Sequence, residues 1–163
     1  MKTLYLMRHA KASRDINGIK DIDRPLLLEG IEGTRRVVDH MKEKKIVIKH
    51  IVSSPALRAM ETANVVAHAY GFRRDEILVY NELYRPDIIA FEDCIFSLPD
   101  DWDHVMLVSH NPGITNFAES LVTMDEAMHT AGVLSLSFPM DRWMNLYAAL
   151  PVYNFFIHPR IVA

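Results

Sequence analysis

The stretch from Leu4 to Lys11, Leu-Tyr-Leu-Met-Arg-His-Ala-Lys, joins a short apolar run directly to an arginine and a histidine. Its first part, Thr3 to Met7, has the length and the β-branched and aromatic content of a strand buried on both faces of a parallel sheet. Arg8 and His9 then lie at the carboxyl end of that strand, where open α/β sheets bind their ligands. The alternative is that the pair only marks where a core strand reaches solvent, so other segments must decide between these interpretations.

The length and composition indicate a single domain over residues 1–163. Half of the residues are hydrophobic and 24% are charged, as in ordinary globular proteins. No apolar run approaches the roughly 20 residues that span a bilayer, and residues 1–3 lead into the first strand without the apolar segment of a signal peptide. We therefore expect a cytoplasmic protein without a membrane partner.

Charge and cysteine content exclude further classes. The net charge of −3 argues against a nucleic-acid partner, which usually requires a basic excess. The single cysteine, Cys94, excludes an intramolecular disulfide. The eight histidines include no His-x-His or His-Glu-x-x-His arrangement, so we expect no metal cofactor. We interpret His158 as a surface or structural residue, and His129 as an exposed loop residue that could also approach a pocket.

The remaining chain alternates predicted strands and helices. This alternation predicts an α/β fold, a single-domain three-layer sandwich in which helices cover both faces of a mostly parallel central sheet. The polar segment 12–24 is long enough to form a loop over whatever lies beside His9. Apolar runs predict strands at 50–53, 77–79, 104–109, 133–138 and 152–157, and helical spacing predicts helices from about 29 to 41, 54 to 67, 87 to 97 and 111 to 122.

Two further signals bring chemistry to the same sheet edge. The run from His104 to Ser109 ends in His110, which repeats the design of the first strand. Ser54-Pro55 combines a favoured N-cap with proline at the first helical position, so Arg58 is expected in the first turn of a helix that follows a strand. Arg8, His9, Arg58 and His110 should therefore converge.

Two arginines and two histidines without carboxylate partners indicate an anionic ligand. Guanidinium groups match phosphate oxygens bidentately, and the backbone N–H groups at a helix N-terminus add donors. Nearby arginines disfavour the imidazolium form, which keeps a nucleophilic lone pair on a histidine at neutral pH. The four residues thus predict phosphoryl chemistry.

These segments resemble one known family. Arg8-His9-Ala10 resembles the Arg-His-Gly signature of the histidine phosphatase superfamily, with alanine in place of the usual glycine, and Ser109-His110-Asn111 resembles its second-histidine junction. Leu27 and Leu28 stand where the family often has threonine. The further matching segments are Ser53-Ser54-Pro55, Leu57-Arg58-Ala59 and Glu61-Thr62-Ala63, together with Arg24-Pro25-Leu26 and Gly30, which resemble the compact branch containing bacterial phosphohistidine phosphatases.

The resemblance implies a phosphoglycerate-mutase-like fold and a role for each matching residue. His9 would be the nucleophile that becomes phosphorylated, and Arg8, Arg58 and His110 would bind the transferring phosphoryl group. Water would then hydrolyse the phosphohistidine, with no cofactor.

Candidates for substrate binding lie around these four residues. Lys11 and Arg24 could line the rim of the site and guide an anionic substrate, although solvation is the default for such side chains. Asn111 is a third candidate because it follows His110 directly.

Three functions remain open from the sequence. The leading hypothesis is a metal-independent phosphatase that acts on a phosphohistidine protein. The second is a small-molecule phosphomonoesterase, or less favourably a mutase, in which Glu82 protonates the leaving group. The third is a non-catalytic module that binds phosphorylated partners, which the presence of both histidines disfavours because arginines alone would suffice for binding.

Overall fold

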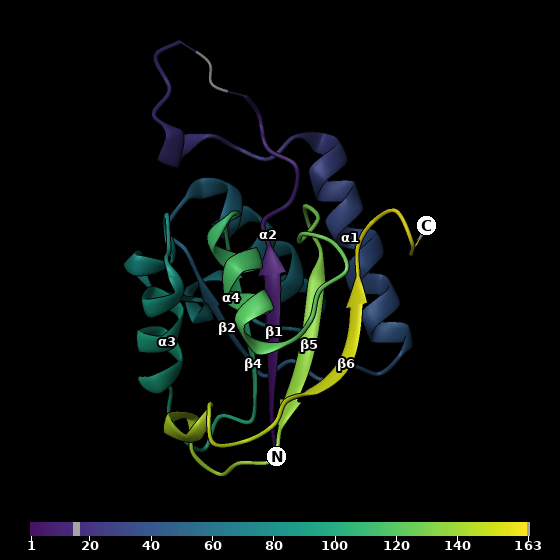
Figure 1. Ribbon diagram of the computed structural model, residues 1–163. Helices are drawn as coiled ribbons and strands as arrows, with labels where there is room; N and C mark the ends of the chain where they lie inside the picture. The colour runs from purple at the N-terminus through teal and green to yellow at the C-terminus, as the bar shows by residue number, and fades with distance from the viewer. Residues whose placement is uncertain (15–16, 163) are drawn as a thin grey trace.

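The fold is built around a six-stranded sheet with the strand order β3-β2-β4-β1-β5-β6. The computed structural model describes residues 1–14 and 17–162, so residues 15–16 of the loop expected at 12–24 lie outside the described residues. β1 (Lys2–Arg8) is central, between β4 (His104–Ser109) and β5 (Val133–Phe138) (Figure 1). The predicted apolar run therefore forms the middle of the sheet.

Most of the sheet is parallel, as predicted. β4 pairs in parallel with β1 and with β2 (His50–Ser53), and β3 (Leu78–Val79) pairs in parallel with β2. β5 runs antiparallel to β1, and the edge strand β6 (Val152–Ile157) runs antiparallel to β5. The carboxyl ends of β1, β2, β3 and β4 consequently share one edge.

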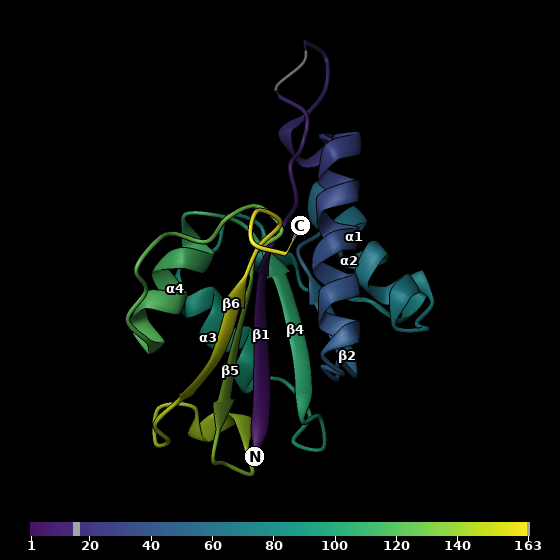
Figure 2. The same cartoon turned by 90° about the vertical axis from the view of Figure 1, so that its right-hand side faces the viewer.

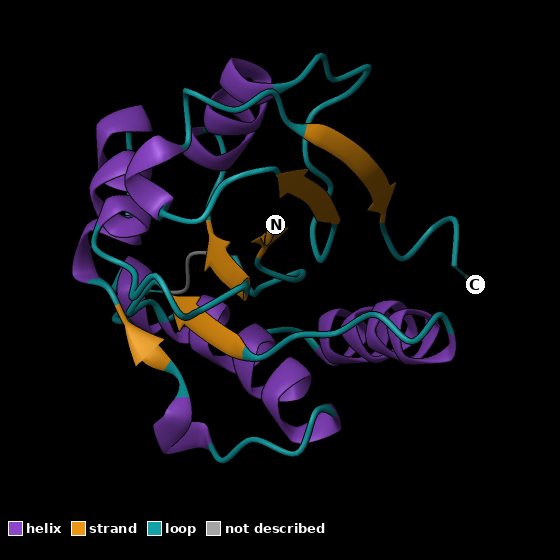
Figure 3. Ribbon diagram, turned by 90° about the horizontal axis from the view of Figure 1, so that it is seen from below, coloured by secondary structure: helices purple, strands orange, loops and turns teal. Residues whose placement is uncertain are grey.

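Helices cover both faces of the sheet, which confirms the predicted three-layer α/β sandwich. α1 (Leu28–Glu43) and α2 (Leu57–Ala69) lie on one face, and α3 (Ile88–Phe96) and α4 (Gly113–Leu121) lie on the other (Figures 2 and 3). Two short 3-10 helices matter for the site: η1 (Asp21–Asp23) and η3 (Asn81–Leu83). Within residues 1–14 and 17–162, none of the helices has the length and apolarity that crossing a membrane requires.

Burial of β1 on both faces explains its continuous apolar sequence. Leu4 and Leu6 belong to the core shared with α3 and α4, whereas Tyr5 and Met7 belong to the core shared with α1 and α2. All four side chains are at most 4% exposed. Burying such a side chain stabilises the fold by about 1.5–3 kcal/mol, so both helical layers anchor the same strand.

The parallel register of β1 and β4 positions the two histidine junctions. Arg8 lies opposite Ser109, and the backbone N–H of His9 donates to the Ser109 carbonyl at 3.0 Å. Since both strands end at the same level, His9 and His110 emerge side by side.

The expected helix start at Ser54-Pro55 is wrong by about two residues. α2 begins at Leu57, and the Ser54 hydroxyl oxygen accepts a hydrogen bond from the Ala56 N–H at 3.2 Å. The same hydroxyl lies 2.7 Å from Nε2 of His110, so a tertiary contact holds Ser54 outside the helix.

Gly30 allows α1 to pack directly on the backbone that follows His9. A Cβ at this position would lie 2.3 Å from the Lys11 carbonyl oxygen, whereas a Cβ at Gly33 would meet only side chains, those of Pro159 at 3.2 Å and Arg36 at 3.8 Å. We expect Gly30→Ala to lower the free energy of unfolding by about 1–3 kcal/mol, as overpacking does. The helix propensity of alanine, about 1 kcal/mol better than that of glycine, offsets this only in part.

Urea unfolding monitored by circular dichroism measures this effect, with Gly33→Ala in the same helix as the matched control. Equal midpoints for the two variants would contradict the importance of the close approach to Lys11.

Candidate active site

His9 carries a lone pair at a defined nitrogen. Its Nδ1 lies 2.7 Å from the Ala10 carbonyl oxygen, and because a carbonyl only accepts, Nδ1 holds the ring proton and Nε2 holds the lone pair. Burial, followed by the charges of Arg58 and Arg8, lowers the pKa of His9 to about 4. His9 is therefore a neutral imidazole with an available nucleophilic nitrogen at neutral pH.

His110 lies beside His9, with 5.0 Å between the ring centroids. The side chain is only 5% exposed, and burial, with smaller contributions from His9 and Arg58, lowers its pKa to about 3. Its Nε2 contacts the Ser54 hydroxyl at 2.7 Å. When the Ser54 hydroxyl donates this hydrogen bond to Nε2, the ring proton of His110 lies on Nδ1. Nδ1 is then a buried hydrogen-bond donor.

Arg8 is held by the loop between α4 and β5. Its Nη1 donates to the Met128 carbonyl at 3.0 Å, and the backbone N–H of Ala131 is within hydrogen-bond distance of the carbonyls of Arg8 and His9, at 3.0 and 3.2 Å. Burial lowers the pKa of Arg8 from its ordinary value. The loop thus fixes both the side chain and the backbone of this junction.

Arg58 is anchored by η1, through a residue that the sequence analysis missed. Its Nη1 donates to the Asp21 backbone carbonyl at 2.8 Å, and its Nη2 to Oδ2 of the Asp21 carboxylate at 3.2 Å. The Tyr84 hydroxyl donates to the same Oδ2 at 2.5 Å. The hydrogen bond from Tyr84 and, to a smaller extent, the contacts with Arg58 lower the pKa of Asp21 to about 2. Asp21 is therefore ionised, and its carboxylate lies among the cations.

Thr62 connects Arg58 to Ala10, the residue after His9. Its hydroxyl accepts from the Ala10 N–H at 2.9 Å and donates to the Arg58 carbonyl at 2.7 Å. Tyr84 completes this surrounding layer, because its ring stands edge-on to that of His110 with centroids 5.7 Å apart. Neither side chain was assigned a role from the sequence, although Thr62 lies in one of the matching segments.

The two expected rim cations differ in their surroundings. The Lys11 side chain is 61% exposed and lies 3.6 Å from the Glu29 carboxylate, outside the histidine pair. Arg24 donates from Nε to Asp21 Oδ1 at 3.0 Å and from Nη1 to the Ser13 carbonyl, and its charge contributes to the lowered pKa of His9. Only Arg24 is thus linked to the cluster around Asp21.

Asn111 makes contacts within the protein through both ends of its amide. Nδ2 donates to the Met128 carbonyl at 3.1 Å, and Oδ1 accepts from the Thr115 hydroxyl at 2.6 Å. The expected helix start, with Asn111 as the cap and Pro112 as the first helical residue, is wrong by one residue. α4 begins at Gly113, and the Asn111 side chain is used in the loop contact and not as a cap.

Glu82 lies on η3 and is exposed. Burial is the main cause of the raised pKa values of Tyr80 and Cys94, and the charge of Glu82 adds to both shifts. The carboxylate that influences the pKa of His110 is that of Asp21. The acidic group with direct contacts to the arginines is therefore Asp21.

Comparisons with known proteins identify a family and a relative that the chain resembles. The model of the histidine phosphatase superfamily (branch 1) matches residues 4–83. The probable phosphoglycerate mutase GpmB of Escherichia fergusonii is 29% identical over 147 residues, which cover 85% of this chain and 65% of that protein. The chain thus spans less than two thirds of the length of this relative.

Solved structures share the fold over nearly the whole chain. SixA from Nakamurella multipartitia has a TM-score of 0.80 and 25% identity, covering 97% of this chain and 96% of that one. The protein histidine phosphatase SixA complexed with tungstate has a TM-score of 0.83 and 21% identity, covering 99% of both chains.

The fold and its paired histidine and arginine junctions define a phosphoglycerate-mutase-like α/β protein. The family model that matches residues 4–83 and the fold shared with SixA make the chain similar to members of the histidine phosphatase superfamily.

The buried histidines predict a specific pH dependence of stability. Burial lowers the folded-state pKa values of His9 and His110 to about 4 and about 3 from 6.5, so the unfolded chain binds these protons at higher pH. The stabilisation from the neutral forms is present above about pH 6.5 and declines as the pH falls toward the two folded-state values. We expect His110→Asn to show a shallower decline than the wild type.

Urea unfolding at several pH values between 7 and 4 provides the measurement. Identical slopes of unfolding free energy against pH for the two proteins would show that burial does not suppress protonation of His110.

Proposed function

We propose that this protein is a phosphatase that removes phosphate from phosphohistidine in proteins, with His9 as the nucleophile. The observation that carries the proposal is the neutral His9 imidazole, whose Nε2 is unprotonated among Arg8, Arg58 and His110. The match of residues 4–83 to the histidine phosphatase superfamily model supports the same activity, as does the fold shared with the protein histidine phosphatase SixA.

The proposed reaction has two phosphoryl-transfer steps. Nε2 of His9 forms a bond to phosphorus while the bond from phosphorus to the substrate imidazole breaks. The departing nitrogen keeps the bonding electron pair, and the imidazole leaves neutral because its other ring nitrogen carries a proton taken from solvent. Water then attacks the phosphohistidine at His9, which releases phosphate and restores the lone pair on Nε2. Both steps proceed through a loose transition state with charge on the equatorial oxygens.

Cationic and hydrogen-bonding groups stabilise that charge. Among the described residues, Arg8 Nε, Arg58 Nε and His110 Nδ1 are buried nitrogens without a hydrogen-bond partner. A phosphoryl group bound among these side chains would bring acceptor oxygens to them. Preorganised donors of this kind typically contribute about 10²–10³ in rate each, so the arginines can supply the charge compensation in the reaction.

The acidic residues favour a phosphoramidate substrate. Hydrolysis of an alkyl phosphate needs a proton for the leaving alkoxide. Glu82 is exposed, and its charge influences the pKa of Tyr80 and of Cys94. The pKa of Asp21 is about 2, which keeps its carboxyl group ionised and without a proton to donate. Phosphohistidine requires less assistance, because imidazole is a better leaving group than an alkoxide.

The direct test is mass spectrometry of acid-labile phosphate after brief exposure to phosphoramidate or to para-nitrophenyl phosphate. We expect phosphate on His9 of the wild type, faster labelling by phosphoramidate, and no turnover by His9→Ala. Arg58→Ala should reduce the rate by about 10²–10³. His68→Asn is the matched control, because His68 is an exposed histidine on α2.

Other outcomes would select the remaining hypotheses. Turnover retained by His9→Ala would refute the nucleophilic role. Faster labelling by para-nitrophenyl phosphate, together with loss of monoester hydrolysis in Glu82→Gln, would favour the phosphomonoesterase. Phosphate-dependent binding without labelling or turnover would indicate a binding module.

Asp21 is expected to oppose oxyanion binding, because its carboxylate contacts the guanidinium of Arg58. One negative charge about 4 Å from another costs about 1 kcal/mol in water-like surroundings. Asp21→Asn should therefore bind tungstate and inorganic phosphate about fivefold more tightly or better, as measured by calorimetry.

Asp23→Asn is the control, since Asp23 is an exposed residue of the same short helix. Weaker binding by Asp21→Asn would instead show that Asp21 serves mainly to orient Arg58.

A further inference from the structure

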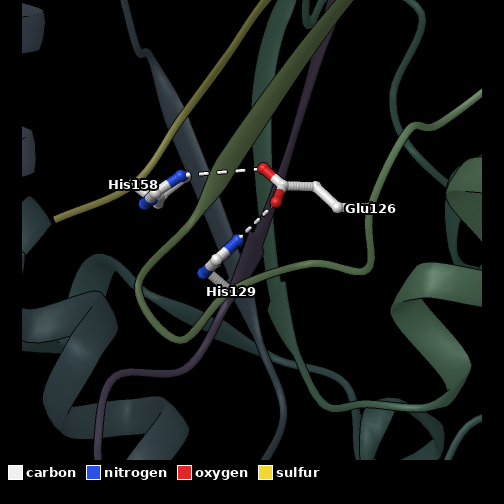
Figure 4. A group of neighbouring side chains, drawn as sticks. All are labelled: Glu126, His129 and His158. Atoms are coloured by element: carbon white, nitrogen blue, oxygen red, sulfur yellow. Dashed lines mark ion pairs between the residues drawn. The ribbon is translucent and has the colours of Figure 1, made fainter. Parts of the chain in front are cut away.

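A second cluster of chemically capable side chains lies outside the proposed phosphoryl site. Glu126 and His129 belong to the loop between α4 and β5, and His158 directly follows β6. Nε2 of His129 lies 3.0 Å from Glu126 Oε2, and Nε2 of His158 lies 3.7 Å from Glu126 Oε1. Figure 4 shows a ring nitrogen of each histidine pointing toward the carboxylate.

The three groups have the spacing of metal ligands. One possible ligand atom from each residue lies within 4.8 Å of the others. Zinc bonds of about 2.0–2.2 Å in a tetrahedral arrangement place ligand atoms about 3.3–3.6 Å apart, and the two histidine–carboxylate distances of 3.0 and 3.7 Å lie close to that range. Because imidazole lone pairs lie in the ring planes, the stacked rings of His129 and His158 must rotate relative to each other for both to bind one ion.

The packing of the histidines keeps the two rings close to each other and to Glu126. The rings of His129 and His158 are stacked with centroids 3.8 Å apart and an angle of 10° between their planes. The His158 side chain is only 8% exposed and that of His129 28%, so neither ring is freely solvated. A single hydrogen-bonded His–Glu pair would need only one of these rings.

We propose that Glu126, His129 and His158 form a binding site for a zinc-type divalent cation. Two imidazoles and one carboxylate are a donor set that zinc uses with a water as fourth ligand, whereas Mg²⁺ and Ca²⁺ prefer oxygen ligands. Both histidines line a cleft of about 390 Å³, whereas Glu126 lines a different cleft.

Zinc binding also requires a hydrogen bond of His158 to open. His158 Nδ1 accepts a long hydrogen bond of 3.3 Å from the Arg160 backbone N–H. Coordination through Nε2 places the ring proton on Nδ1, so this bond must open. The amide resonance of Arg160 should therefore shift when zinc binds, which provides a spectroscopic signature of His158 coordination.

The proposed ion would link the C-terminal segment to the loop that holds the active site. Met128, between two of the ligands, accepts hydrogen bonds from Arg8 and Asn111 through its carbonyl. Fixing Glu126 and His129 to His158 would restrain this loop without contributing to the proposed phosphoryl transfer. The role expected of the ion is therefore structural.

The test uses the full chain, freed of metal with a chelator, and titrated with ZnCl₂ by calorimetry. We expect one zinc ion per chain, no comparable binding of MgCl₂, and affinity lowered at least tenfold in Glu126→Gln and in His158→Asn. At zinc concentrations about 100 times the wild-type Kd, the folding equilibrium constant should rise about 100-fold in the wild type and at most about tenfold in the two variants, as seen by thermal unfolding.

Glu119→Gln and His68→Asn are matched controls, since both residues are exposed on helices outside the cluster. The proposal is overturned if the wild type binds zinc no more tightly than Glu126→Gln, or if zinc leaves the Arg160 amide unshifted. Glu126 is half exposed, so its variant should fold, and thermal unfolding of the metal-free proteins verifies this. These readouts do not depend on phosphatase activity.

Discussion

The parallel pairing of β1 with β4 is the constraint on which the site depends. Because Arg8 is opposite Ser109, the residues that follow the two strands leave the sheet at the same level, and the rings of His9 and His110 meet. A shift of one residue in this register would place the alternate residues of β1 in the wrong helical layer. The two hydrophobic cores therefore maintain the distance between the histidines.

The surrounding loops convert this sheet edge into a defined electrostatic environment. The loop containing Met128 holds Arg8, whereas η1 reaches Arg58 through Asp21. The arginine charges and burial act on His9 in the same direction, and both favour its neutral form. The neutral state of His9 thus depends on several segments, of which only the one that carries Arg8 is adjacent to it along the chain.

The predictable features were those with local signals. Apolar runs that end in polar residues predicted β1 and β4, and helical spacing placed Arg58 near the same edge. Asp21 was not predictable, because its contacts with Arg58 and Tyr84 join residues 37 and 63 positions apart. The starts of α2 and α4 were misplaced for a related reason: Ser54 and Asn111 have the chemistry of helix caps, but their side chains contact His110 and Met128.

The carboxylate of Asp21 also bears on how a reaction cycle at this edge would end. Because Arg58 and Arg24 already have an anionic partner within the chain, the departure of a product anion does not leave these guanidinium groups without a counter-charge. Release of a product anion would therefore carry a smaller electrostatic cost, which limits retention of inorganic phosphate.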